Sequence, residues 1–428
     1  MIASTYIVFL LLGGGYAVLL SSLPVKIFPE FFFYPWLVSR GLVQYRDFFD
    51  HHGFLTNIIL APLVNNISNI AIVFIAVQLA QYGFVFFLIY KKVKKPLILF
   101  LLSLMYLSFQ YVVVGQTIWY DEFIALLLIA AWYLMENKKE RISFFCIACA
   151  TMIKPTALPF VVPFYIKAKN GKSILVFITA WIIALTYFFC TGALKELWKQ
   201  LFVFNYLYIP GAYLAQPIIV PLRLLISIWG CFGVIVLLSF YKGKKVFALV
   251  FTTIIASLSY FLGFIKLNFA LFAPFFTLLI AENEKKQKIY VLLMLLFLNV
   301  VFIREGYKVF NELKNSKPYL SNEAIREGKQ ILSLIKYKKD KNVLIIGNRV
   351  ELYYLLNTLP PEFTPIHFPW VTKVYPNPPS LNGIRYIIVP KKLAQYETLD
   401  ITINRRLNKD FKQIGDTNSF RIFEFNAP

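Results

Sequence analysis

The chain has 428 residues, of which 58% are hydrophobic, and its mean hydropathy is +0.63. Soluble domains contain about 45–50% apolar residues, so this composition excludes an ordinary soluble protein and indicates a polytopic membrane protein. The 44 Lys and Arg outnumber the 22 Asp and Glu, which gives a net charge of +22. In the apolar part many basic residues form short clusters between apolar runs, which indicates membrane topology and attraction to anionic lipid rather than a nucleic-acid partner.

The apolar runs predict an α-helical membrane domain with about ten to eleven membrane segments. Residues 5–23 form the first, which we interpret as a retained helix because it lacks the flanks of a cleaved signal peptide. The later runs lie at 70–90, 96–114, 123–135, 142–166, 173–190, 218–240, 246–264, 269–281 and 289–303.

One of these runs, 142–166, is interrupted by Lys154 and Pro155. A single straight span would place the basic clusters at 137–141 and 167–172 on opposite sides of the membrane. A hairpin of two short helices with Lys154 at its apex keeps both clusters on the cytoplasmic side. We therefore expect a hairpin.

With this hairpin, the basic clusters between the apolar runs all fall on one face, which the positive-inside rule identifies as cytoplasmic. The loop at 24–54, Asp121, Glu122, Lys154 and the C-terminal region are then predicted on the extracytoplasmic side of the plasma membrane. The clusters lie at 91–95, 137–141, 167–172, 241–245 and 282–288.

From residue 304 the apolar runs shorten and charges of both signs increase. This change predicts a small extracytoplasmic α/β domain at 304–428, after a membrane domain at 1–303. The elements expected in it are helices at 322–336 and 350–356 and strands at 342–347, 385–389 and 420–425.

The loop after the first span contains an unusual group of polar residues. Glu30, Asp47 and Asp50 lie there with His51 and His52, in a part of the chain that has few acids. Carboxylates are costly near a bilayer, so this cluster indicates chemistry or ion binding.

Two interpretations stay open for the acids of this loop. Glu30 follows Pro29 at the start of a predicted helix, where a carboxylate is stabilised by the helix dipole. Alternatively, Glu30 is a general base whose proton affinity is raised by partial desolvation. Arg46 and Asp47 form either a local ion pair or a site in which Asp47 holds a metal or a substrate hydroxyl and Arg46 contacts a phosphate.

Each of the remaining polar candidates also has one structural and one functional interpretation. His51 and His52 are adjacent, a spacing that seldom makes a two-histidine metal site, so either one contacts phosphate or metal or both are ordinary interfacial residues. Asp121 and Glu122 either cap a helix or complete a site with the first loop. Lys154 either extends to the membrane interface or binds the phosphate of a lipid-linked donor.

Glu30, Gly41 and the stretch YRDFFDHHGFL at 45–55 resemble the first outer loop of the GT-C membrane glycosyltransferases, which include protein O-mannosyltransferases and aminoarabinose transferases. MIKPTAL, at 152–158, is similar to a Lys-containing turn further along such proteins. The resemblance implies two interfacial helices after the first span and an outer C-terminal domain. It also implies that Glu30 occupies the position of the catalytic acid.

The chain departs from the family pattern at two positions. Relatives commonly carry Asp-Glu or Asp-Asp where this chain has Pro29 and Glu30, and many have Pro where this chain has Gly53. Asp47 is therefore the second candidate for the catalytic base.

The resemblance implies transfer of a sugar from a polyprenyl-phosphate or polyprenyl-diphosphate donor to a glycan, lipid or protein acceptor on the outer face, with inversion. Glu30 or Asp47 would deprotonate the acceptor hydroxyl. No cofactor is required, and a divalent metal at Asp47 or Asp121 is compatible with the pattern. Two other functions stay open, a transporter or flippase of lipid-linked glycans and a polymerase or ligase of preassembled glycans. The candidate substrate-binding residues are Tyr45, Arg46, His51, His52, Asp121, Glu122 and Lys154.

Overall fold

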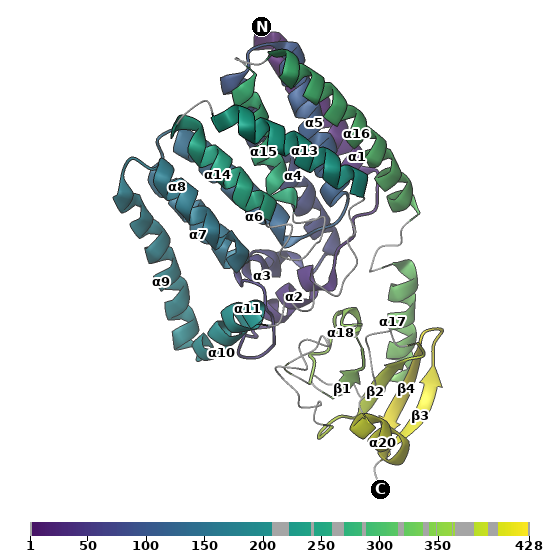
Figure 1. Ribbon diagram of the computed structural model, residues 1–428. Coiled ribbons are helices and arrows are strands. Elements are labelled where there is room, and N and C mark those ends of the chain that lie inside the picture. The colour runs from purple at the N-terminus through teal and green to yellow at the C-terminus, as the bar shows by residue number, and fades with distance from the viewer. Residues whose placement is uncertain are drawn as a thin grey trace.

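A bundle of helices is followed by a small α/β unit at one end of the bundle (Figure 1). The computed structural model describes residues 2–207, 222–240, 244–258, 269–284, 288–315, 321–336, 342–347, 349–361, 363, 381–392 and 401–426. Parts of the predicted segments at 218–240 and 246–264, and of the basic cluster at 241–245, lie outside these residues.

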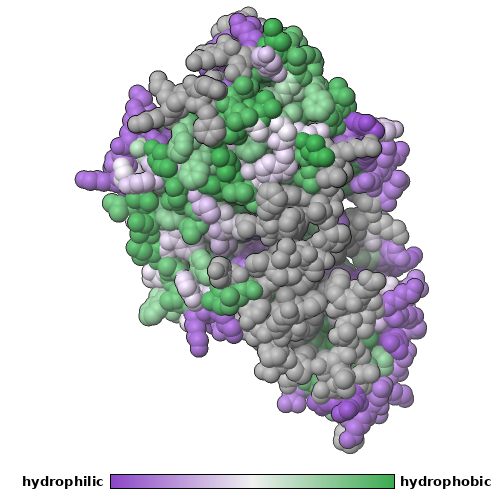
Figure 2. Space-filling view, viewed as in Figure 1, coloured by the Kyte–Doolittle hydropathy of each residue, from purple (hydrophilic) through white to green (hydrophobic). Residues whose placement is uncertain are grey.

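Four of the described helical stretches are long and apolar enough to cross a membrane. Fewer stretches than predicted reach this length, because several apolar runs form shorter helices. Apolar side chains cover much of the visible face of the bundle (Figure 2). The four are α4 (Ile67–Lys92), α5 (Pro96–Val114), Gly171–Cys190, which includes η4 (Gly171–Ser173) and α9 (Ile174–Cys190), and α16 (Lys288–Lys314). The shorter apolar stretches are Thr5–Ser21 in α1 (Ile2–Ser21), Leu224–Ser239 in α13 (Leu222–Phe240), Val246–Leu258 in α14 (Lys244–Leu258) and all of α15 (Phe272–Asn283).

The chain turns back at Lys154, as the predicted hairpin requires. The backbone of Lys154 is extended, with φ −158° and ψ 128°, because a residue before proline disfavours the helical region. At the other end, the Glu140 carboxylate accepts hydrogen bonds from the N–H groups of Lys169 (2.9 Å) and Asn170 (3.0 Å). Both ends of the hairpin therefore lie together. Its elements are α7 (Glu140–Ile153), η3 (Pro155–Phe160) and α8 (Val161–Lys167).

Basic residues between the helices meet at the end of the bundle away from Lys154. Lys167 lies 2.6 Å from Glu136, the last residue of α6 (Tyr120–Glu136). Lys92, at the end of α4, forms an ion pair with Glu282 in α15. These contacts bring together loops that the charge pattern predicted on one face.

The loop after α1 forms short helices that pack against the C-terminal unit. Phe32 and Phe33 are fully buried. The ring centroid of Phe32 lies 5.5 Å from that of Tyr354, and the Phe33 centroid lies 6.0 Å from that of Tyr353. This aromatic contact joins the first loop to the α/β unit. The short helices are η1 (Pro29–Phe31), α2 (Phe33–Ser39), α3 (Leu55–Leu60) and η2 (Ala61–Leu63), and both tyrosines lie in α18 (Glu351–Leu356).

The C-terminal unit contains a four-stranded sheet of order β1-β2-β4-β3. β1 (Val343–Ile345) is parallel to β2 (Tyr386–Pro390), while β4 (Phe420–Phe425) is antiparallel to both β2 and β3 (Phe411–Asp416). The three predicted strands are confirmed, but β3 was missed because this edge strand is largely polar and exposed. The helices are α17 (Asn322–Leu334), α18 and α20 (Ile401–Asp410), of which α20 was not predicted.

The composition change at residue 304 does not coincide with the end of a helix. α16 continues from the apolar run to Lys314. Its last turns are polar, and Lys308 there pairs with Glu305 at 2.6 Å, an i,i+3 contact that supports a helix in water.

Candidate functional site

The candidate site is formed by the loop between α2 and α3, which packs against the end of α7. The N–H of Gly53 donates to the carbonyl oxygen of Ile153 at 2.9 Å. A Cβ added at Gly53 would lie 1.9 Å from the carbonyl oxygen of Met152, so only glycine permits this approach. The loop is thereby fixed beside Lys154.

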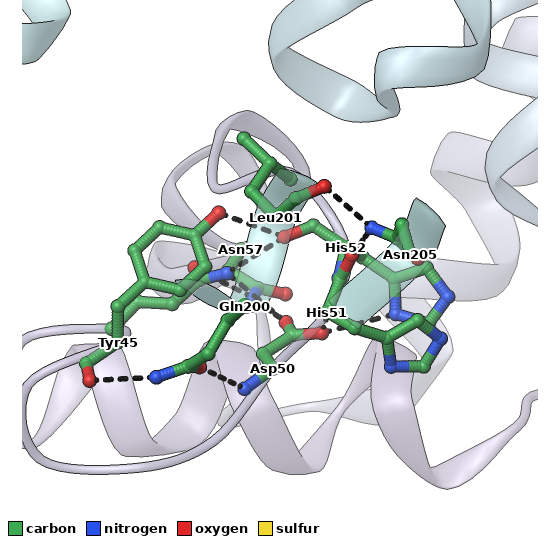
Figure 3. A network of polar contacts seen from close by, with 9 residues as sticks. Tyr45, Asp50, His51, His52, Asn57, Gln200, Leu201 and Asn205 are labelled. Carbon is green, nitrogen blue, oxygen red and sulfur yellow. Dashed lines mark hydrogen bonds and ion pairs between the residues drawn. The ribbon is translucent and has the colours of Figure 1, made fainter. Parts of the chain in front are cut away.

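Asp50 is the centre of a buried hydrogen-bond network in this loop (Figure 3). Its Oδ2 accepts from the side-chain amides of Gln44 (3.1 Å) and Asn57 (2.8 Å). Its Oδ1 lies 2.9 Å from the backbone N–H of His52 and 3.0 Å from Nδ1 of the same residue. Four donors therefore surround this carboxylate. Burial raises the pKa of Asp50 to about 7, while the hydrogen bonds from His52 and Asn57 act in the opposite direction.

A distant segment holds the same loop from the other side. Gln200 accepts the backbone N–H of Asp50 at 3.0 Å and donates to the carbonyl oxygen of Tyr45 at 3.0 Å. Asn205 donates to the carbonyl oxygen of His51 at 2.7 Å. Gln200 belongs to a π-helical turn, a feature often found at functional sites. The segment consists of α10 (Leu194–Trp198), the π-helix η5 (Lys199–Phe204) and α11 (Asn205–Leu207).

Glu30 has a buried carboxylate oxygen, Oε2. Among the residues that the structure describes, none donates a hydrogen bond to it. Burial, and secondarily the charge of Asp50, raise the pKa of Glu30 to about 7, although its own backbone N–H has the opposite effect. Glu30 lies in the first turn of η1, whose N-cap residue is Phe28. A carboxyl with this pKa can exchange a proton near neutral pH.

The two histidines stand beside Asp50 as neutral rings in contact. Their ring centroids are 4.0 Å apart with the planes tilted by 39°, and His52 also stacks on Tyr120 at 4.0 Å. Burial lowers the pKa of both histidines well below the usual value, and Lys154 lowers both further. Neutral imidazoles do not attract a phosphate by charge, so the predicted phosphate contact at His51 or His52 loses its electrostatic basis.

The two acids of the second loop point to different places. Asp121 lies 2.9 Å from Lys154, and their side chains are 2% and 19% exposed. Glu122 instead accepts a hydrogen bond at 2.7 Å from Gln110 in α5. Asp121 and Lys154 therefore join the first loop, whereas Glu122 is part of the helix packing.

Arg46 and Asp47 form the local ion pair that the sequence left open. The guanidinium contacts both carboxylate oxygens of Asp47 at 2.8 Å, and the two side chains are 46% and 23% exposed. Asp47 Oδ2 also accepts the N–H of Val43 at 2.8 Å. Tyr45 is buried, with its hydroxyl donating to the carbonyl oxygen of His52 at 2.8 Å. These contacts give all three residues a part in shaping the loop.

Asp50, His51 and His52 offer ligand atoms within 4.8 Å of one another. As they stand, these side chains do not fit a coordination site, because both oxygens of Asp50 already accept two hydrogen bonds each. A metal on Asp50 would have to displace one of these donors. Asp47 and Asp121, the predicted metal positions, are paired with Arg46 and Lys154.

The ion pair of Lys154 with Asp121 and the stacking of His52 on Tyr120 connect the second loop with the hairpin and the first loop. Arg46 and Asp47 pair with each other, and Glu122 contacts Gln110. The sequence predicted one site from Glu30, Tyr45, Arg46, Asp47, His51, His52, Asp121, Glu122 and Lys154. It gave no role to Asp50, although this acid precedes the His pair. Gln44, Asn57 and Gln200 were also missed, since amides carry no signal in a single sequence. No protein-family model matches the chain, and no curated protein matches it significantly.

Proposed function

We propose that this protein is an integral-membrane glycosyltransferase that moves a sugar from a polyprenyl-phosphate-linked donor to a glycan, lipid or protein acceptor. The reaction takes place on the extracytoplasmic face of the plasma membrane, and the C-terminal α/β unit lies on the same side. The chain crosses or enters the membrane with about ten to eleven segments.

The observation that carries this proposal is the buried, unpartnered Oε2 of Glu30 beside the Asp50 network. A general base works best when its pKa is close to the working pH. With a pKa of about 7, Glu30 is partly ionised in neutral solution and still binds a proton firmly. Asp50 is less suited to this task, since its oxygens are already hydrogen-bonded.

In the proposed reaction, the acceptor hydroxyl gives its proton to Glu30 as its oxygen attacks the anomeric carbon of the donor. The bond from that carbon to the phosphate oxygen breaks, and polyprenyl phosphate leaves with the electron pair. A single displacement inverts the configuration at the anomeric carbon.

Lys154 is the favoured partner for the donor phosphate. Its ammonium is at the hairpin apex and is partly exposed. The loop between α2 and α3 (residues 40–54), called the acid loop below, is hydrogen-bonded to the neighbouring Ile153. Phosphate oxygens can replace the Asp121 carboxylate as the partner of Lys154, because both are anionic acceptors. Arg46 is the weaker candidate, since Nε and Nη2 of its guanidinium already donate to the two carboxylate oxygens of Asp47.

An apolar groove beside the π-helix suits the prenyl chain of the donor. Its volume is about 760 Å³, and Phe202 of η5 forms part of its wall. The same π-helix holds Asp50 through Gln200, so the groove adjoins the acid loop. The other large side chains that line it are Trp181, Leu185, Phe189, Leu194, Lys195, Leu197 and Trp198.

The test is transfer by the purified protein from radiolabelled polyprenyl-phosphate sugars in lipid nanodiscs. Wild type is expected to form labelled product, and Glu30→Gln to lose about 100-fold or more of the rate. Glu312→Gln, which removes an exposed carboxylate of α16, is the matched control and is expected to retain wild-type activity. Vesicle translocation of the donor without product would instead support a flippase, and wild-type turnover by a folded Glu30→Gln variant would exclude Glu30 as the base.

A further inference from the structure

The Asp50 carboxylate is saturated in a way that fixes its neighbour. Each of its oxygens has two donors, and the side-chain donors include His52 Nδ1 at 3.0 Å. An ionised carboxylate offers about four acceptor positions, so no position is left for a substrate. Above its pKa of about 7, Asp50 is ionised and has no proton to give, so the hydrogen in this contact then belongs to Nδ1 of the imidazole.

The second nitrogen of His52 is then unprotonated. A neutral imidazole carries one N–H, and with Nδ1 protonated the lone pair is on Nε2. Among the described residues, none forms a hydrogen bond with Nε2 of His52. Ring contacts with Tyr120 and His51, both at 4.0 Å, and burial restrict the ring from turning away.

The surroundings of His52 indicate which ligand would meet this lone pair. Two contacts bring Lys154 towards His52: Gly53, the next residue after His52, donates to the carbonyl oxygen of Ile153 at 2.9 Å, and Lys154 pairs with Asp121, the neighbour of the Tyr120 that stacks on His52. If Lys154 holds the donor phosphate, the sugar attached to that phosphate lies next to His52. Sugar hydroxyls are donors that match an unprotonated nitrogen, whereas phosphate oxygens are not.

We propose that Nε2 of His52 accepts a hydrogen bond from a hydroxyl of the donor sugar, and that Asp50 is a positioning residue that fixes the required tautomer of His52. This inference rests on the proposed function for its ligand. It assigns donor-sugar recognition to His52 and leaves proton abstraction to Glu30. The arrangement follows a general rule in which the partner of one imidazole nitrogen determines the state of the other.

The tautomer can be observed without any transferase assay. The chain has three histidines, so a protein labelled with ¹⁵N-histidine gives three imidazoles, and His367→Asn removes one of them. At about pH 9, well above the pKa of about 7 of Asp50, His52 is expected to show a protonated Nδ1 and an unprotonated Nε2. In Asp50→Asn the amide can donate to Nδ1, and the proton is expected to move to Nε2. An unprotonated Nδ1 in the wild type would overturn the inference.

The ligand is tested by adding polyprenyl-phosphate sugars to the labelled protein. A bound sugar hydroxyl is expected to shift the Nε2 resonance of His52. Saturable donor binding that leaves this resonance unchanged would overturn the inference but not the proposed function. Failure of every polyprenyl-phosphate hexose and pentose to bind would overturn both.

A double-mutant cycle then checks that Asp50 acts through His52. The amide oxygen of Gln can stand in for Nε2, so His52→Gln is expected to keep more activity than His52→Ala, which should raise the KM for the donor roughly tenfold. Asp50→Asn is expected to raise the donor KM in the wild type and to add little in the His52→Gln background. Additive effects with intact folding would exclude the positioning role.

Discussion

The Lys154 ammonium lies 2.9 Å from the Asp121 carboxylate, and this contact joins the apex of the α7–α8 hairpin to the start of α6. The two residues are 33 positions apart in the chain. The loop that carries Asp50 meets the same hairpin, because the N–H of Gly53 donates to the carbonyl oxygen of Ile153 at 2.9 Å.

Removing the Lys154 charge should destabilise the protein. Lys154→Met leaves the nearly buried Asp121 without a counter-charge, a change that costs about 3–5 kcal/mol in fully buried pairs and less here because Lys154 is 19% exposed. The expected result is a lower thermal unfolding midpoint, measured by intrinsic fluorescence in detergent. Lys391→Met, which breaks the exposed pair with Asp416, is the control and should cost less than about 1 kcal/mol. Equal losses of stability in Lys154→Met and Lys391→Met would contradict a larger contribution from the Lys154–Asp121 pair.

Gly53→Ala should displace the acid loop. The new Cβ would meet the Met152 carbonyl oxygen at 1.9 Å, a backbone atom that cannot move aside without shifting the end of α7. We expect lower thermal stability and loss of transfer. Gly14→Ala has no atom within 4 Å of the added Cβ and should leave both unchanged. A Gly53→Ala variant with wild-type stability would show that the contact is not needed.

Transfer should depend on the ionisation of Glu30. Its pKa of about 7 predicts that kcat/KM rises with pH and levels off above that value, because the base acts in its ionised form. The pH profile of transfer in nanodiscs measures this rise of kcat/KM, and the residual activity of Glu30→Gln should not show it. A rise of kcat/KM with pH that persists unchanged in Glu30→Gln would assign the titration to another group, such as Asp50, whose pKa is also about 7.

The same pKa shift predicts how stability changes with pH. The pKa of Glu30 rises from 4.5, its ordinary value, to about 7 on folding, so the folded state binds this proton more tightly than the unfolded state. Its contribution to the free energy of unfolding is therefore present below about pH 4.5 and lost as pH rises to about 7. The difference in unfolding temperature between Glu30→Gln and wild type should therefore be more positive at pH 8 than at pH 5. A more positive difference at pH 5 would contradict a raised pKa of Glu30.

Asp47→Asn separates the two candidate bases. Asp47 is partly exposed and paired with Arg46, so the substitution should lower transfer less than about tenfold, through loosening of the loop. The rate in nanodiscs, compared with that of Glu30→Gln, provides the measurement. Complete loss in a folded Asp47→Asn variant, with Glu30→Gln active, would make Asp47 the base.

Much of the fold follows from local patterns. The broken run at Lys154 and Pro155 predicted a turn because proline restricts the residue before it, and the chain does reverse there. Stretches rich in β-branched or aromatic residues predicted β1, β2 and β4, while the largely polar edge strand β3 carried no such signal. Helix ends were harder to predict, since α16 continues into a polar stretch in which Lys308 pairs with Glu305 on the helix surface.

The chemistry of the site was also predictable from the sequence only in part. The sequence determined which residue types gather in the first loop, because acids and histidines stand out in an apolar chain. Only the tertiary structure decided their states, since Asp50 is held by Gln200 from 150 positions away and Asp47 is satisfied by its neighbour Arg46. Burial, hydrogen-bond partners and the direction of each pKa shift depend on such distant contacts, and these arise only when the chain is folded.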